Sequence, residues 1–292
     1  MPRSRTPPKL SAYEREQLRR IGAWRAAAPD ALTRGIAKVT APAGNAIQKI
    51  IPTAALRVAL ARVQSTAARL GDRRSILKRA GVDRLEALRD ADLETCDGLA
   101  DHVRKRGMAL AGGSGALFGV AGGLGLVADV PTLLVQTFRV IHRVGLCYGE
   151  DFAEASAQRL PIGVFALASA NTLAEKQAAL AAIEQATVSA DTGWREGLER
   201  AAERELAKEA AVFSLNNLAQ SVTRRLGLRK AASGLPILGA LVGGAVNAWY
   251  LNEVARAAQV TFQMRWLWRR HGGAETLDAM RASLAALPLI EE

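Results

Sequence analysis

The sequence predicts an all-α protein, a single multi-helix bundle with two central glycine-rich apolar helical segments. Apolar residues make up 49% of the 292 residues but aromatic residues only 5%, and alanine, leucine and glycine supply most of the apolar part. That composition suits closely packed helices, because sheets favour β-branched and aromatic residues. No alternation of apolar and polar residues is long enough to predict a strand.

The chain divides into a short tail and one domain. Residues 1–11 are basic and contain several prolines, which predicts a disordered tail, and residues 12–290 form the expected helical domain. Ser11 followed by Glu14 is a capping-box pattern that marks the first helix start. A further helix is expected over residues 53–70, before Gly71.

Helical periodicity is clearest in two segments. Residues 83–104 and 194–213 both show apolar residues at helical spacing, and the second reads as an ordinary surface helix. In the first segment the expected buried positions are Leu85, Leu88, Leu93, Leu99 and Val103.

Three stretches carry no formal charge, namely residues 107–128, 160–174 and 231–252. The first and third are as long as a bilayer-spanning helix, which needs about 20 residues. The middle stretch is too short to span and is predicted to be a buried core helix.

The two long stretches are unusually rich in glycine, which costs about 1 kcal/mol relative to alanine in an exposed helix. Glycines four apart expose bare backbone along one helical face, so they indicate close helix–helix contact. The predicted contact residues are Gly115, Gly119 and Gly123 in the first stretch, and Gly239 and Gly243 in the second.

The sequence leaves open whether these stretches enter lipid or form a glycine-rich protein core. Basic residues flank each stretch on both sides, and the chain carries a formal charge of +11. Under the positive-inside rule such flanks suit a hairpin that enters a membrane and returns to the same face. Against insertion, glycine and alanine contribute little to membrane transfer.

Two blocks resemble the EcsC family, one at residues 112–151 and one at 235–257. The first contains the glycines followed by Asp129, Pro131, Arg139, Tyr148, Gly149, Glu150 and Asp151, and the second contains Leu235, Pro236, Gly239, Gly243 and Asn247. The family is named for a protein encoded beside an ABC-type exporter in some bacteria. The resemblance therefore implies a membrane-linked role, with a transporter subunit as a partner. It transfers no catalytic residues.

The basic charge predicts an anionic membrane surface as the other partner. The first thirty residues show no signal-peptide pattern, so we expect the protein on the cytoplasmic side, peripheral or partly inserted in the cell membrane.

Asp129 and Pro131 follow the first glycine-rich stretch. We expect Asp129 to be the N-cap of a helix beginning near residue 130, with Pro131 in its first turn. The alternatives are an ion pair with Arg139 or Arg143 that joins two segments, or a polar ligand contact at membrane depth.

The segment 148–151 predicts a helix end. Gly149 is expected to be the C′ residue in the left-handed conformation, with Glu150 and Asp151 solvated in the following turn. Asn247, inside an uncharged stretch, is expected to be buried and bonded across a helix–helix contact.

No pattern typical of a metal, nucleotide or cofactor site is found, and the three histidines are scattered. Residues 262–270 mix tryptophan with arginine, which suits either a membrane interface or the packed edge of a core. Nucleic-acid binding is not expected, because the basic residues are spread along the chain and no binding motif is present.

The predicted function is a membrane-associated, non-catalytic accessory or interaction protein, and we do not expect an enzyme. The alternative is a hydrolase that uses Asp129, Glu150 or Asp151, and it requires these carboxylates to share one cleft.

Overall fold

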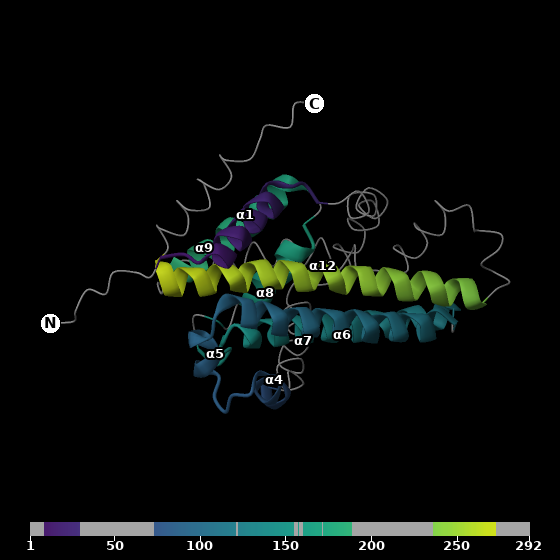
Figure 1. The fold of residues 1–292 in the computed structure, drawn as a ribbon. Helices are drawn as coiled ribbons and strands as arrows, with labels where there is room; N and C mark the ends of the chain where they lie inside the picture. Colours follow the sequence, from purple (N-terminus) through teal and green to yellow (C-terminus); the bar gives the residue numbers. More distant parts are fainter. Residues whose placement is uncertain are drawn as a thin grey trace.

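The computed structural model describes residues 9–29, 73–120, 122–154, 157, 160–170, 172–188 and 236–272, and within these ranges the protein is all-α (Figure 1). The predicted helical bundle is therefore confirmed for the described part of the chain. The helices are α1 (Ala12–Ala26), α4 (Arg73–Ala80), α5 (Glu86–Asp90), α6 (Leu93–Val120), α7 (Gly122–Cys147), α8 (Leu160–Ala168), α9 (Leu173–Val188) and α12 (Pro236–His271).

Three long helices form the centre of the fold, with α6 packed against both α7 and α12 (Figure 1). Gln263 contacts Asp97 and Asn252 contacts Arg104, so residue numbers fall along α12 as they rise along α6. Tyr148, directly after α7, likewise contacts Asp97 near the beginning of α6. Both neighbours of α6 are therefore antiparallel to it.

The amphipathic segment 83–104 buries the face that its spacing predicts. Leu85, Leu88, Leu93, Leu99 and Val103 are all buried in one hydrophobic core. The segment contains two helices, α5 and α6, rather than one. The carboxylate of Asp92 accepts a hydrogen bond of 2.7 Å from the backbone N–H of Thr95, and thereby caps the start of α6.

The short uncharged stretch contributes the predicted core helix, α8. Val164, Phe165 and Leu167 are buried, and the Phe165 ring stacks on Phe138 of α7 with centroids 5.3 Å apart. The helix ends at Ala168, and α9 begins at Leu173.

Helix α1 starts with the predicted capping box. The Ser11 hydroxyl accepts from the Glu14 backbone, and the Glu14 carboxylate accepts from the Ser11 backbone. Leu18 and Ile21 are buried on its inner face. An ion pair between Arg25 and Glu184 joins α1 to α9.

The first glycine-rich stretch is not one helix. Helix α6 ends at Val120 and α7 begins at Gly122, so Gly115 and Gly119 lie on α6 while Gly123 lies on α7. The predicted single face of three glycines is therefore wrong. Gly239 and Gly243 lie on α12. The packing around these five glycines, residues 1–8 of the tail, and the helices expected at 53–70 and 194–213 lie outside the described residues. Residues 9–11 are ordered, since Leu10 packs against the core and Ser11 caps α1.

Close approach of α6 and α7 is visible at Gly107, where the stretch begins. A Cβ atom at this position would lie 2.9 Å from Cγ2 of Val140. In the described part of the chain, no helix has the continuous apolar length that a membrane crossing needs.

Candidate functional site

A buried carboxylate on α6 joins three helices. Asp97 is 6% exposed and accepts hydrogen bonds from the hydroxyls of Tyr13 (2.8 Å) and Tyr148 (2.5 Å). The side-chain amide of Gln263 donates to both of its oxygens at 2.9 Å. These donors come from α1, from the residue after α7, and from α12.

The electrostatics of this cluster are those of a satisfied buried acid. Burial raises the pKa of Asp97, while the hydrogen bonds from Tyr148, Tyr13 and Gln263 act to lower it. Burial and the neighbouring Asp97 raise the pKa of Tyr148 well above its ordinary value. The tyrosines are thus held as neutral donors, and the cluster fastens helices together.

Removing one donor from this cluster tests its structural role. Tyr13→Phe deletes one hydrogen bond to a buried carboxylate that keeps its other donors, so we expect a loss of about 1 to 2 kcal/mol in the free energy of unfolding. Urea unfolding of the full chain measures it. Arg19→Gln on the same helix removes only an exposed ion pair, and its effect should stay below about 0.5 kcal/mol. Equal effects of the two changes would contradict the role given to Asp97.

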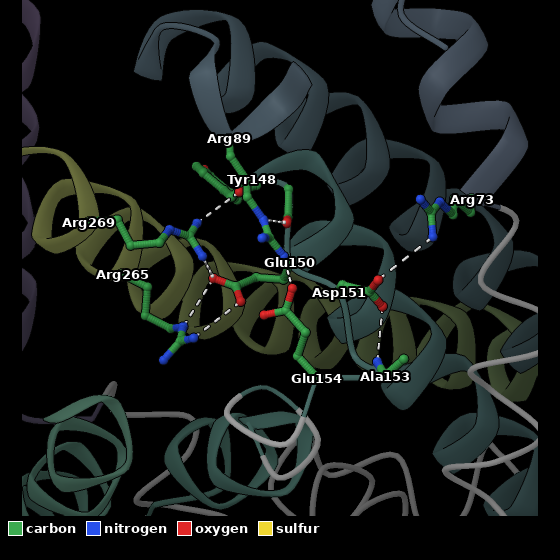
Figure 2. Close-up of polar contacts among 10 residues, drawn as sticks. Arg73, Arg89, Tyr148, Glu150, Asp151, Ala153, Glu154, Arg265 and Arg269 are labelled. Carbon is green, nitrogen blue, oxygen red and sulfur yellow. Dashed lines mark hydrogen bonds and ion pairs between the residues drawn. The ribbon is translucent and has the colours of Figure 1, made fainter. Parts of the chain in front are cut away.

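A second buried carboxylate follows α7. Glu150 is 2% exposed and accepts two hydrogen bonds from Arg265, at 3.0 and 3.3 Å, and one of 2.6 Å from Arg269 (Figure 2). Arg269 also donates to the Tyr148 carbonyl at 2.9 Å. The expectation that Glu150 is solvated is therefore wrong, because α12 brings two arginines over the turn.

The turn itself has the predicted glycine geometry. Gly149 has φ +73°, its N–H bonds to the Leu146 carbonyl, and the Glu150 N–H bonds to the Gly145 carbonyl. This pattern is a Schellman motif, which confirms Gly149 as the C′ residue of α7. The Arg89 guanidinium donates to the Gly149 carbonyl at 2.7 Å and holds α5 against the turn (Figure 2).

Asp151 lies at the surface beside this turn. Its carboxylate accepts from the Ala153 N–H at 3.0 Å, and Arg73 of α4 is 4.0 Å away (Figure 2). Asp151 and Glu150 are neighbours in sequence, but only Glu150 is buried.

Asp129 is not the N-cap of a helix. Helix α7 begins at Gly122 and continues through Asp129 and Pro131, because tertiary packing overrides the local start signal. On one helix, Asp129 and Arg139 are separated by about 15 Å along the axis. The predicted ion pair between two segments is therefore wrong for Arg139, and Arg143 lies still farther along.

Two other predicted residues are placed on long helices. Asn247 on α12 is buried, as predicted, and the hydrogen bond expected across a helix contact stays a prediction. Arg143 on α7 donates to the Ser75 hydroxyl at 3.3 Å and so contacts α4.

Residues 15–267 match the model of the EcsC protein family, and this range includes most of the chain. The chain belongs to the EcsC protein family. No curated protein and no solved structure matches it. The family match includes Asp97, Tyr148, Glu150 and Gln263, so the central carboxylate of each cluster falls within the EcsC region.

The predicted hydrolytic site is not assembled in this EcsC protein. Asp129 lies on α7 about 27 Å along the axis from Cys147, where that helix ends just before Glu150. Glu150 is enclosed by arginines, and Asp151 faces the surface. The carboxylates therefore share no cleft.

Sequence reasoning missed the residues that complete the two clusters, namely Tyr13, Asp97, Gln263 and Arg265. A usable signal exists for Asp97, since it lies one turn after Leu93 on the apolar side of α6. Of residues 262–270, Phe262, Trp266 and Leu267 are buried in the core, as the core alternative predicts, while Arg270 is exposed.

A cavity of about 220 Å³ lies where α1, α8, α9 and α12 meet, with Trp24, Lys176, Glu253 and Arg256 in its lining. The Lys176 ammonium donates to the carbonyls of Trp24 and Ala27, the latter at 2.9 Å, and lies 3.8 Å from the centroid of the Trp24 ring. Lys176 thus caps the end of α1. Among the described residues, no group of three or more potential ligands could hold a metal ion.

Proposed function

We propose that this EcsC-family protein is a non-catalytic accessory protein that docks on the anionic cytoplasmic face of the cell membrane through one end of its three long helices. A transporter subunit in that membrane is the second proposed partner, on the ground of the family resemblance. The proposal rests on one observation, which is that the uncharged ends of α6, α7 and α12 lie side by side.

These ends are remote in sequence and adjacent in the fold. Residues 107–120 of α6, 122–128 of α7 and 236–252 of α12 contain no charged residue. Because α6 runs antiparallel to both other helices, its end lies beside the beginnings of α7 and α12 (Figure 1).

Basic residues lie behind the charge-free ends, and on α6 they follow directly, as Arg104, Lys105 and Arg106. On α7 the first charged residue is Asp129, before Arg139, and on α12 it is Glu253, before Arg256. Anionic headgroups attract such residues, while the uncharged ends favour the acyl region. The uncharged part of α6 is about 20 Å long, less than the roughly 30 Å of a bilayer core, which suits partial insertion.

The buried carboxylates support a role without catalysis. The carboxylates of Asp97 and Glu150 accept hydrogen bonds from side chains of other helices. A hydrolase needs a carboxylate that can reach substrate and exchange a proton with it. Asp97 and Glu150 are instead committed to the fold.

An exposed leucine on the charge-free part of α6 permits a direct test. Leu110 is 53% exposed, so Leu110→Glu should leave the fold intact and lower binding to vesicles containing phosphatidylglycerol at least about tenfold. Flotation measures the binding, and thermal unfolding checks the fold.

Leu173 provides the matched control, since it is 41% exposed and lies on α9, which is not one of the three long helices. Leu173→Glu should bind vesicles like the unchanged protein. Failure of the unchanged chain to float with anionic vesicles, or equal loss in both variants, would refute the proposed docking.

A further inference from the structure

A basic surface lies where α4 packs against α6 and α7. His102, Lys105 and Arg106 occupy one turn of α6 at i, i+3 and i+4, so they share a helical face. Arg79 lies near the end of α4, which the hydrogen bond from Arg143 to Ser75 holds against α7. We call Arg79, His102, Lys105 and Arg106 the basic surface.

The members of the basic surface lie close enough to act on one another. Burial lowers the pKa of His102, and the positive charges of Arg79, Arg106, Arg143 and Lys105 lower it further. A neutral histidine among cations accepts a proton more readily once an anion is bound beside it. The local field therefore favours an anionic ligand.

Among the residues that the structure describes, ion pairs compensate this surface at one edge. Asp101 is 3.0 Å from Arg104 and 4.0 Å from Lys105, so its charge is directed mainly to Arg104. Within the described part of the chain, Arg79 and Arg106 make no ion pair, and both are exposed. Each guanidinium group can donate to two phosphate oxygens.

The basic surface continues into the apolar side of α6. Arg106 and the exposed Leu110 are four residues apart, so they are neighbours on one helical face. A phospholipid offers a phosphate that matches Arg106, and next to it an acyl chain that matches Leu110. Nucleic acid offers phosphates without an adjacent apolar phase, which makes lipid the better match.

We propose that the basic surface binds the phosphate groups of anionic membrane phospholipids, with Leu110 directed toward the acyl region. This inference rests on the proposed membrane docking and adds the site that recognises the headgroup. It also sets the depth of docking, because α4 and the middle of α6 would then lie at the level of the headgroups.

The test removes three positive charges from this surface and compares the loss of vesicle binding with that caused by removing three positive charges elsewhere. The variant Arg79→Gln, Lys105→Gln, Arg106→Gln should bind phosphatidylglycerol-containing vesicles about 100-fold more weakly than the unchanged chain. The control variant Arg15→Gln, Arg19→Gln, Arg20→Gln removes the same formal charge from exposed positions on α1 and should lose less than about tenfold.

The outcomes separate this inference from the proposed function. Anionic-vesicle binding that falls equally in both triple variants would refute the basic surface and leave membrane docking in place. Absence of vesicle binding by the unchanged chain would refute both. Inorganic phosphate should displace the protein no better than chloride at equal ionic strength, and stronger displacement would assign the surface to a soluble phosphate. Tighter binding to duplex DNA than to vesicles at the same salt would also overturn the inference.

Discussion

Replacing Glu150 by glutamine is expected to lower the free energy of unfolding by about 3 to 5 kcal/mol. Glutamine preserves the size of the side chain but removes the negative charge that faces the buried Arg265. Arg265 is almost fully enclosed and makes two bonds to this carboxylate, and Arg269 makes a third. The cost arises because a negative charge within hydrogen-bond distance of a buried guanidinium is lost.

The next residue gives a matched control for this change. Asp151→Asn also neutralises one carboxylate, but Asp151 is 31% exposed at its side chain and lies 4.0 Å from Arg73. The expected loss is below about 1 kcal/mol. The losses in the free energy of unfolding, measured by urea unfolding of the two full-length variants, should therefore differ severalfold. Equal losses would mean that the buried ion pair stabilises the fold no more than the exposed one.

These adjacent acids also show where sequence reasoning stops. The bundle can be predicted because apolar spacing is a local property, as with Leu85 and Leu88 in the buried face of the segment before α6. Burial of Glu150 depends on Arg265, which is 115 residues away in sequence. Nothing local distinguishes Glu150 from Asp151, so the sequence predicts that both are solvated.

The start of α7 escapes prediction for a related reason. An aspartate two residues before a proline is a local helix-start signal, and the glycines before it argue against a helix. In the folded chain α7 begins at Gly122 and packs along α6 and α12, and this packing outweighs the local preference. The role of Gly149 is predictable because the left-handed conformation of a C′ glycine depends only on the turn in which it lies.

Gly149→Ala is expected to cost about 3 kcal/mol or more in the free energy of unfolding, because two effects add. At φ +73° an L side chain is strained by about 1 to 2 kcal/mol. A Cβ atom would also lie 2.5 Å from Cγ and 2.7 Å from the backbone nitrogen of Arg89, so α5 would have to move and its bond to the Gly149 carbonyl would weaken.

Gly81 separates the two effects, because it has φ +69° and no atom within 4 Å of the place that a Cβ atom would take. Gly81→Ala should therefore cost only the backbone strain, about 1 kcal/mol. Gly98→Ala, at an open position inside α6, should stabilise the protein by about 0.5 to 1 kcal/mol. This order across urea unfolding of the three variants would show that Gly149 is required by the approach of α5. If Gly149→Ala and Gly81→Ala cost the same, the contact with Arg89 carries no weight, and the conformation of the turn alone explains the glycine.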